Sequence, residues 1–307
     1  MKIGIVGSGA IGLTFAAALA PAMDVIVLAR RASVAELLAR DGIAIDRGPR
    51  TEHVRVSATA DPRAFFERDA VIVAVKSFST ASALEPLRDV LAPHTLVASV
   101  QNGIDNAGVA RSVLPRARVI AGSTTQGAIR LGDGRIRPAN DGTTTFARDA
   151  SAWPASDDLA AAFAAAGLSA QVTGDIQAVL WRKLVVNAAL NPSCALTSRE
   201  NGAVVTDPDL GALARTLALE AAAVARAEDV DVGDPWLAVE AAASASTANR
   251  NSMLQDLDAG RPTEIDAISG AVVRRAATHG IAVPVTEAVL RLVRGRERAA
   301  VEHRSGG

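Results

Sequence analysis

The sequence has little cysteine and few aromatic residues, and each shortage excludes a class of structure or function. Tyrosine is absent and aromatic residues make up only 3% of the chain, so platforms for stacking nucleic-acid bases are not expected. The single cysteine, Cys194, excludes an internal disulfide and suits a reducing compartment, which favours a cytoplasmic location. The formal net charge of −1 offers no general attraction to nucleic acid or to anionic lipid.

Lysine is also scarce. Of the 32 basic residues only Lys2, Lys76 and Lys183 are lysines, and the remaining 29 are arginines. Where arginine is so strongly preferred, a retained lysine is a candidate for a task that arginine cannot perform. An ammonium group can release its proton near neutral pH, whereas a guanidinium group effectively cannot. The alternative is that the three lysines are survivors of drift without a function.

Length and composition are those of a globular protein with about two domains. The chain has 307 residues, of which 49% are hydrophobic and 21% are charged. Residues 3–23 carry no charge and resemble a signal peptide or a membrane span, but their four glycines favour a strand, a tight turn and a helix. The four histidines lack the spacing of metal ligands, so no metal is expected.

The N-terminal segment KIGIVGSGAIG has the spacing of a dinucleotide-binding turn. A short β-rich run ends before Gly7, Gly9 and Gly12, and the helix former LTFAAALA follows. This strand–turn–helix context makes the G-x-G-x-x-G pattern informative: the first glycine permits the turn, the second lets a pyrophosphate approach and the third lets the helix pack closely. Residues 7–12 (Gly7, Ser8, Gly9, Ala10, Ile11 and Gly12) are therefore candidate cofactor-binding residues at a helix N-terminus.

The end of the second predicted strand indicates which dinucleotide is bound. An NAD site usually has an acidic residue there, but this strand, from Asp24 to residue 28 or 29, is followed by Arg30 and Arg31. Arginine can form a bidentate contact with a 2′-phosphate, which favours NADPH over NADH and makes Arg30 the candidate ligand. The alternative is a solvated arginine pair, and for Arg31 the two interpretations stay equally open.

Two further predicted strands end in polar residues. Residues 70–75 lead into Lys76, and residues 95–100 lead into Gln101, Asn102 and Gly103. The carboxyl ends of parallel strands face the ligand crevice of an open sheet, so Lys76 and Asn102 are candidate contacts of a cofactor or substrate. An ordinary Asn-Gly turn is the alternative for residues 102–103.

The remaining pattern predicts hairpins and then helices. Short β segments between about residues 119 and 148 predict hairpins, and a helix over 158–167 with a strand after it completes a domain of residues 1–173. Residues 174–307 are expected to form an all-α domain, so the fold class is α/β with an N-terminal Rossmann-like doubly wound sheet. Its predicted helices run from Asp175 to Pro192, over 208–228, 235–249, 263–278 and 284–297, with a disordered tail at 305–307.

One predicted helix carries a polar stripe. Lys183, Asn187 and Asn191 recur every four residues, so they lie along one helix face. A polar stripe in a cleft needs partners that a polar ligand could supply, although a solvated face is the alternative. Glu264 is predicted in the first turn of its helix, where an acidic residue is common without any function.

These motifs together resemble the ketopantoate reductase family, over almost the whole chain. The resemblance rests on MKIGIVGSGAIG, AVKSF, the QNG turn, WRKLVVNAALNPSCALTSRENG and NSMLQDLDAGRPTEID. It implies an NADPH-dependent reduction of 2-dehydropantoate (ketopantoate) to pantoate, in pantothenate and coenzyme A biosynthesis. Two departures are Asn251, where a serine often precedes Ser252, and the stretch from Pro192 to Leu196, which could alter substrate choice.

The resemblance also implies roles for individual residues. It makes Lys183 the catalytic lysine and general acid, with Glu264 accepting a hydrogen bond from a substrate hydroxyl. It places Arg30 at the cofactor phosphate, Lys76 at the crevice for cofactor and substrate, and Asn102 at both ligands. The implied substrate-binding residues are Asn102, Asn187, Asn191, Asn201 and Ser252.

Two alternative functions remain open at this stage. One is a reductase of another branched 2-oxo acid, or of an imine, and the other is a non-catalytic NADP(H)-binding redox sensor. A sensor would not need Lys183, Asn187 and Glu264 together, which favours the enzyme. The expected binding partner is a small 2-oxo acid substrate. Binding to nucleic acid or to a membrane is not expected, and a homodimer is possible.

Overall fold

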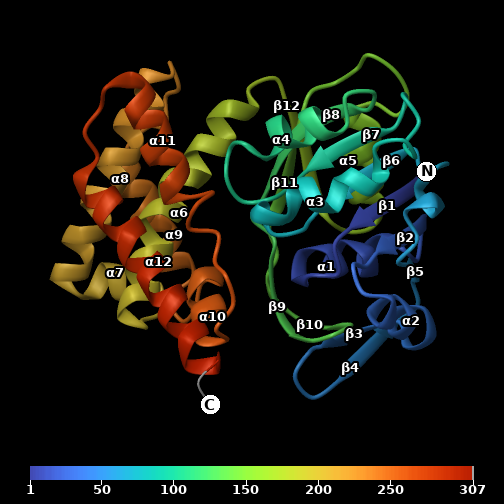
Figure 1. The fold of residues 1–307 in the computed structure, drawn as a ribbon, viewed down its shortest axis with the longest axis horizontal. Helices are drawn as coiled ribbons and strands as arrows, with labels where there is room; N and C mark the ends of the chain where they lie inside the picture. Colours follow the sequence, from blue (N-terminus) through green and yellow to red (C-terminus); the bar gives the residue numbers. More distant parts are fainter. Residues whose placement is uncertain (306–307) are drawn as a thin grey trace. The chain divides into compact units, whose positions relative to one another are not determined.

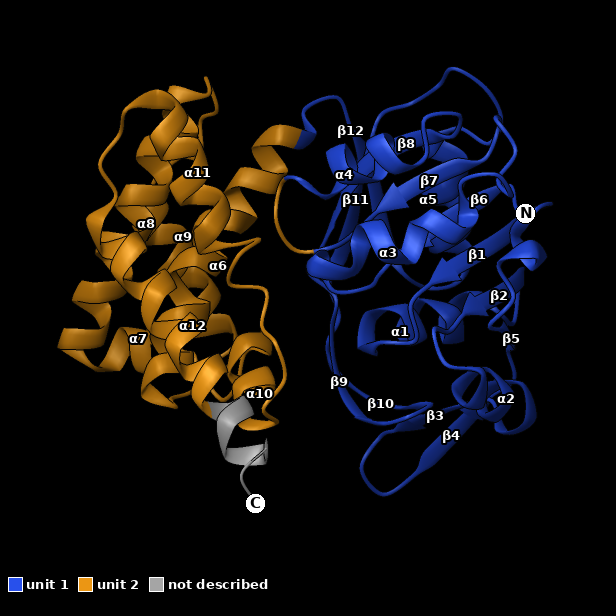
Figure 2. Ribbon diagram, in the orientation of Figure 1, with its two compact units in different colours: residues 1–101, 105–176 blue, residues 102–104, 177–307 orange. Residues whose placement is uncertain are grey.

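The computed structural model describes residues 1–305, and the side chains of residues 1–299. The chain forms two compact units (Figure 2). Unit 1 comprises residues 1–101 and 105–176, and unit 2 comprises residues 102–104 and 177–307. The short QNG turn of the sequence is therefore divided, since Gln101 belongs to unit 1 and Asn102 to unit 2.

Unit 1 contains an eight-stranded sheet that confirms the predicted α/β class (Figure 1). The strand order is β12-β11-β8-β7-β6-β1-β2-β5, and all neighbours are parallel except β11 and β8. The strands of this sheet are β1 (Lys2–Val6), β2 (Asp24–Leu28), β5 (Ser57–Thr59), β6 (Ala70–Val73), β7 (Leu96–Ser99), β8 (Arg118–Thr124), β11 (Thr143–Ala147) and β12 (Ser169–Thr173). Strand β1 pairs with β2 on one side and β6 on the other, so the winding reverses at β1, where such sheets bind ligands.

Helices cover both faces of this sheet because its strands are apolar on both sides. In β6, Ala70 and Ile72 contribute to one core, and Val71 and Val73 contribute to the other. The first core includes residues of α1 (Ala10–Leu19), α2 (Ala32–Asp41) and α5 (Ser156–Ala165). The second includes residues of α3 (Thr80–Leu84) and α4 (Asn106–Val113). Continuous apolar strands of this kind are typical of parallel sheets buried on both faces.

A smaller sheet was missed by the sequence interpretation. It has the order β4-β3-β10-β9, formed by β3 (Ile43–Asp46), β4 (Thr51–Val54), β9 (Gly127–Gly132) and β10 (Arg135–Asn140). The predicted hairpins include the antiparallel pair β9–β10, but β10 also pairs in parallel with β3, whose partner residues lie 91 positions earlier. Short 3₁₀ helices at Pro62–Phe65, Ser77–Ser79 and Glu85–Leu87 complete unit 1.

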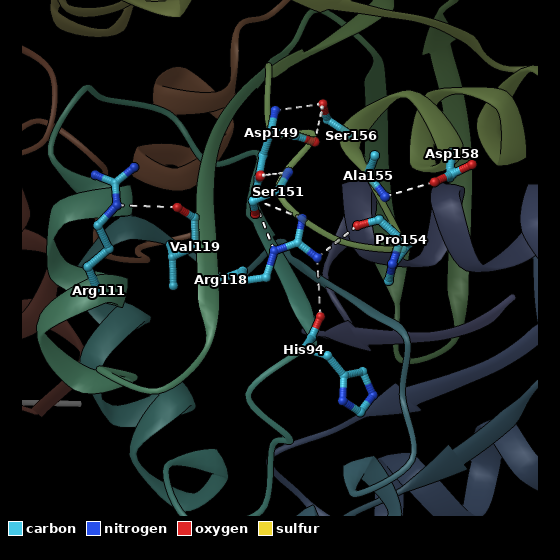
Figure 3. A network of polar contacts seen from close by, with 10 residues as sticks. All are labelled: His94, Arg111, Arg118, Val119, Asp149, Ser151, Pro154, Ala155, Ser156 and Asp158. Atoms are coloured by element: carbon cyan, nitrogen blue, oxygen red, sulfur yellow. Dashed lines mark hydrogen bonds and ion pairs between the residues drawn. The ribbon is translucent and has the colours of Figure 1, made fainter.

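A polar network fixes the segment that leads from β11 to α5 (Figure 3). Arg118 donates to the Asp149 carboxylate at 2.9 Å and to the carbonyl oxygen of Pro154 at 3.0 Å. Burial opposes ionisation of Asp149, but hydrogen bonds from Ser151 and Arg118 outweigh it and lower the pKa of this carboxyl group. Because the Arg118 and Asp149 side chains are 15% and 18% exposed, this pair is better shielded than most ion pairs among the described residues.

Unit 2 is helical, as predicted (Figure 1). Its helices are α6 (Ile176–Thr197, whose first residue is the last of unit 1), α7 (Ala203–Thr206), α8 (Pro208–Ala227), α9 (Pro235–Ala245), α10 (Ser252–Asp258), α11 (Ser269–His279) and α12 (Pro284–Ser305). No helix in the described residues is long and apolar enough to cross a membrane.

Four predicted helix boundaries were wrong, and one of them is that of α9, which ends at Ala245 and not at residue 249. Helix α6 continues through Pro192 to Thr197, although proline removes one backbone hydrogen bond inside a helix. Helix α11 begins at Ser269, so Glu264 precedes it in a turn and does not lie in its first turn. Helix α12 continues beyond Glu297 to Ser305, and the rest of the predicted tail, residues 306–307, lies outside the described residues.

Candidate active site

The glycine turn connects β1 to α1, and two of its glycines are required by the protein itself. Gly7 has a φ of +120°, which side-chain-bearing residues rarely adopt. A Cβ atom at Gly12 would lie 2.1 Å from the carbonyl oxygen of Gly7, which is far inside van der Waals contact. Gly7 therefore makes the sharp turn, and Gly12 lets α1 pack against it.

Gly9 is different, because the protein leaves room for a side chain there. The nearest atom to a Cβ at Gly9 would be the carbonyl oxygen of Ala74 at 3.9 Å, an ordinary contact. Gly9 is the N-cap residue of α1, whose first turn has no side-chain cap and no acidic residue. Ser8, Ala10 and Ile11 beside it are partly exposed. This open backbone at a helix N-terminus fits the pyrophosphate of a dinucleotide.

The two arginines after β2 differ in their surroundings. The Arg31 side chain forms an ion pair with Asp133 of the β9–β10 turn at 2.7 Å, and Asp133 also contacts Arg130. Arg30 is exposed, and it has no ion pair or side-chain hydrogen bond with the described side chains of residues 1–299. Of the two, only Arg30 therefore presents an uncommitted guanidinium group, two residues after Leu28, whose carbonyl oxygen accepts from the Gly7 N–H of the glycine turn.

Lys76 lies in the turn after β6, and a buried glutamine fixes that turn. Gln101 is 6% exposed, and its Nε2 donates to the carbonyl oxygen of Val75 at 2.9 Å and to the Thr80 hydroxyl at 2.7 Å. Its Oε1 accepts from the Ser99 hydroxyl at 3.0 Å. Gln101 thus joins the residue before Lys76 to the end of β7. The sequence interpretation missed it, although its place directly before Asn102 was a signal.

Lys183 lies in the middle of α6 and is partly buried as a residue. Burial of its amine lowers the pKa to about 8, and the nearby Glu264 carboxylate opposes that change by attraction. Lysine in water has a pKa near 10.4, so this side chain can release and recover a proton much closer to neutral pH. A buried lysine with such a pKa is typical of functional sites.

Glu264 reaches the same unit's Asn102 across 162 residues of sequence. Its Oε2 accepts a hydrogen bond from the Asn102 Nδ2 at 2.9 Å, and Glu264 is only 6% exposed. Gly103, with a φ of +96°, lets the chain turn immediately after Asn102. The structure therefore brings Asn102 and Glu264 together, and the charge of Glu264 acts on Lys183.

Asn187 and Asn191 continue the face of α6 that begins with Lys183. Asn191 is 6% exposed and Asn187 is partly buried. Neither amide has a side-chain hydrogen-bond partner within the described part of the chain. Neither amide is among the fully buried polar atoms without a partner, so both remain accessible and form a polar surface that a bound molecule could complete.

Asn201 and Ser252 have different environments. Asn201 is 4% exposed, its Nδ2 donates to Ser246 at 2.9 Å and its Oδ1 accepts from Asn251 at 3.1 Å. Asn251 also caps α10 by accepting from the backbone N–H of Leu254 at 3.1 Å, whereas Ser252 is exposed. A serine at 251 could cap the helix, but it would lack the amide that reaches Asn201.

The geometry of unit 2 suits an acid-catalysed step on a polar, oxygen-rich molecule. It provides a lysine that titrates near pH 8, a buried carboxylate that can accept hydrogen bonds, and amides that can donate them. Within the described residues no group of three or more histidine, cysteine, aspartate or glutamate side chains could hold a metal ion.

Comparison with known families decides the classification. The model of the ketopantoate reductase PanE/ApbA family matches residues 3–150, and the model of its C-terminal domain matches residues 175–297. The chain belongs to the ketopantoate reductase family. The resemblance inferred from the motifs is therefore confirmed, and the protein is a member of a family of oxidoreductases.

Individual relatives agree over nearly the full length. The 2-dehydropantoate 2-reductase of Halobacterium salinarum is 36% identical over 97% of this chain and 99% of its own. A PanE/ApbA family ketopantoate reductase from Ralstonia eutropha has a TM-score of 0.89 at 34% identity, covering 98% of this chain and 99% of its own. A D-mandelate dehydrogenase with NADH and anilino(oxo)acetate has a TM-score of 0.90 over 98% and 99% of the two chains, but at 23% identity it shows the fold alone.

Proposed function

We propose that this protein reduces 2-dehydropantoate to pantoate with NADPH. The observation that carries the proposal is the amine of Lys183, whose pKa burial lowers to about 8, on a helix face continued by two uncommitted asparagine amides. Membership of the ketopantoate reductase family supports the choice of substrate. The residue roles below rest on the geometry of each unit.

Bound NADPH would supply the hydride to the C2 ketone of the substrate. The ketone oxygen becomes anionic, and Lys183 stabilises this charge and donates the proton that completes the alcohol. Glu264 accepts a hydrogen bond from the substrate's own hydroxyl, and its contact with Asn102 holds it in place. Asn102, Asn187, Asn191, Asn201 and Ser252 contribute further polar groups to substrate binding.

The residues of unit 1 fit the proposed cofactor. The turn at residues 7–12 and the N-terminus of α1 would hold the pyrophosphate, and Arg30 would bind the 2′-phosphate that distinguishes NADPH from NADH. Lys76, on the turn fixed by Gln101, would contribute a second positive charge. Arg31 is held by Asp133, which argues against a direct part in phosphate binding.

An assay of NADPH oxidation with added 2-dehydropantoate tests the proposal. Consumption of NADPH that depends on this substrate, with NADH clearly inferior, is the expected result. A panel of other branched and aromatic 2-oxo acids tests the substrate, since a better substrate in the panel would replace 2-dehydropantoate in the proposal. Binding of NADPH without turnover of any member of the panel would contradict an enzymatic function and favour a redox sensor.

A further inference from the structure

The carboxyl-terminal half of α12 contacts two segments that carry the proposed active-site residues of unit 2. Arg296 donates to the carbonyl oxygens of Ala195 and Leu196, at the end of α6. The next residue, Glu297, accepts a hydrogen bond from the backbone N–H of Thr263 at 2.7 Å. Thr263 directly precedes Glu264, so Glu297 holds the backbone next to the buried carboxylate, while Arg294 of the same helix pairs with the exposed Asp266 two residues further on.

The turn around Glu264 also has internal hydrogen bonds, which determine how it could move. The Thr263 hydroxyl accepts from the N–H of Ile265 at 3.1 Å, and the carbonyl oxygen of Glu264 accepts from Ala267 and Ile268 at 3.0 Å. These bonds keep the shape of the turn, but all of them lie within residues 263–268. Two contacts tie the turn to α12: Arg294 pairs with the exposed Asp266, and Glu297, 34 residues from Thr263, accepts from the backbone directly beside Glu264.

We propose that Glu297 is a positioning residue for the reduction, because its carboxylate fixes Thr263 and thereby sets the place of Glu264 beside Asn102. The proposal rests on the proposed function, since Glu264 is the residue through which Glu297 would act on the substrate. A displaced Glu264 would hold the substrate's hydroxyl out of line, and small displacements of this kind are costly in catalysis.

Two substitutions at Glu297 distinguish the loss of its hydrogen-bond acceptor from the loss of its negative charge. Glu297→Ala removes the acceptor and is expected to lower kcat/KM for the 2-oxo acid by about 10- to 100-fold, with the KM for NADPH unchanged. Glu297→Gln keeps a carbonyl oxygen that can accept from Thr263, so it is expected to restore most of the activity. Glu287→Ala is the matched control, because Glu287 lies on the same helix and its ion pair among the described side chains is with the exposed Arg291.

A double-mutant cycle tests whether Glu297 acts through Glu264. The loss caused by Glu297→Ala should disappear when Glu264 is already alanine, because the residue being positioned is then absent. A loss of the same size in both backgrounds would show a general structural role and would overturn the proposal. Activity of Glu297→Ala equal to that of Glu287→Ala would overturn it as well.

A readout that does not depend on turnover separates this proposal from the proposed function. With only three lysines in the chain, selective ¹³Cε labelling gives three side-chain signals, which Lys2→Arg and Lys76→Arg assign. Because Glu264 raises the pKa of Lys183 by attraction, Glu297→Ala should lower that pKa, whereas Glu287→Ala should leave it unchanged. An unchanged pKa of Lys183 in Glu297→Ala would contradict the positioning role, and a wild-type protein that reduces no 2-oxo acid would contradict the proposed function alone.

Discussion

The glycine turn of unit 1 and the Lys183 region of unit 2 are built in opposite ways. The turn consists of six consecutive residues, and its shape follows from local requirements such as the φ of +120° at Gly7. The Lys183 region combines residues 102, 183 and 264, which meet only because unit 2 folds around them. The first can be recognised from spacing, and the second depends on packing between distant segments.

The comparison also shows two ways of preparing a site for a ligand. At the turn, the protein leaves space that a Cβ atom at Gly9 could fill without a close contact. In unit 2, it leaves polar groups incompletely matched, with a lysine whose cation is disfavoured by burial and two asparagine amides without partners in the described residues. The buried amine of Lys183 reduces stability while it is charged, and a functional site commonly accepts that cost.

The largest effect is expected at Lys183. Lys183→Ala should lower kcat for reduction by about 10²- to 10⁴-fold, the usual contribution of a general acid. Lys183→Arg should fail as well, because a guanidinium keeps the charge but cannot give up its proton near neutral pH. Steady-state kinetics with NADPH and the 2-oxo acid measures both variants, and near-normal kcat in either would remove Lys183 from the proton-donor role.

A stability measurement on Lys183→Met tests whether misfolding explains the loss of activity in the Lys183 variants. Below pH 8 the buried amine of Lys183 is charged in the folded protein, and its desolvation lowers the free energy of unfolding. Methionine at the same position carries no charge and avoids this penalty. Lys183→Met is therefore expected to unfold at the same or a higher temperature than the wild type at pH 7. A marked drop in its Tm would mean that Lys183 is primarily structural.

The next effect contrasts two glycines of the turn. Gly12→Ala places a methyl group against the Gly7 carbonyl and should destabilise the protein by about 1–3 kcal/mol, seen as a lower Tm. Gly9→Ala should leave the Tm unchanged but weaken NADPH binding by about 10- to 100-fold, as the phosphate loses its close approach. Unchanged NADPH affinity in Gly9→Ala would contradict pyrophosphate binding at this turn.

A smaller effect contrasts the neighbouring arginines. Arg30→Ala should raise the KM for NADPH by about tenfold through loss of a charge-assisted hydrogen bond, with little change for NADH. Arg31→Ala should change the KM for either dinucleotide very little, and it removes an ion pair that is exposed enough to contribute only about 0–1 kcal/mol to stability. Reversal of the two results would assign the phosphate to Arg31.

The same contrast explains what could be predicted from the sequence. The strand, turn and helix around Gly7, Gly9 and Gly12 were predicted correctly because their shape depends on neighbours in sequence. The face of α6 that carries Lys183 and Asn191 followed from helical periodicity alone. The pairing of Arg31 with Asp133 could not be predicted, because it joins residues 102 positions apart.

Two errors in unit 2 arose where packing overrode a local rule. Proline commonly ends a helix, but α6 continues past the buried Pro192, and Arg296 of another helix binds the carbonyl oxygens near its end. Thr263 and Glu264 resemble a helix start, yet the hydrogen bond from Thr263 to Glu297 belongs to a turn that precedes α11. Neither contact can be predicted from local sequence, because each joins residues that are far apart in the chain.

The pH dependence of kcat/KM for reduction tests the central claim about Lys183 most directly. Because the proton donor must be protonated, kcat/KM should be level below pH 8 and fall by about tenfold per pH unit above it. In Glu264→Ala the fall should begin at lower pH, since the attraction that raises the pKa of Lys183 is gone. A wild-type kcat/KM that stays level to pH 10 would contradict the assignment of Lys183 as the general acid. So would a fall that begins at the same pH in Glu264→Ala as in the wild type.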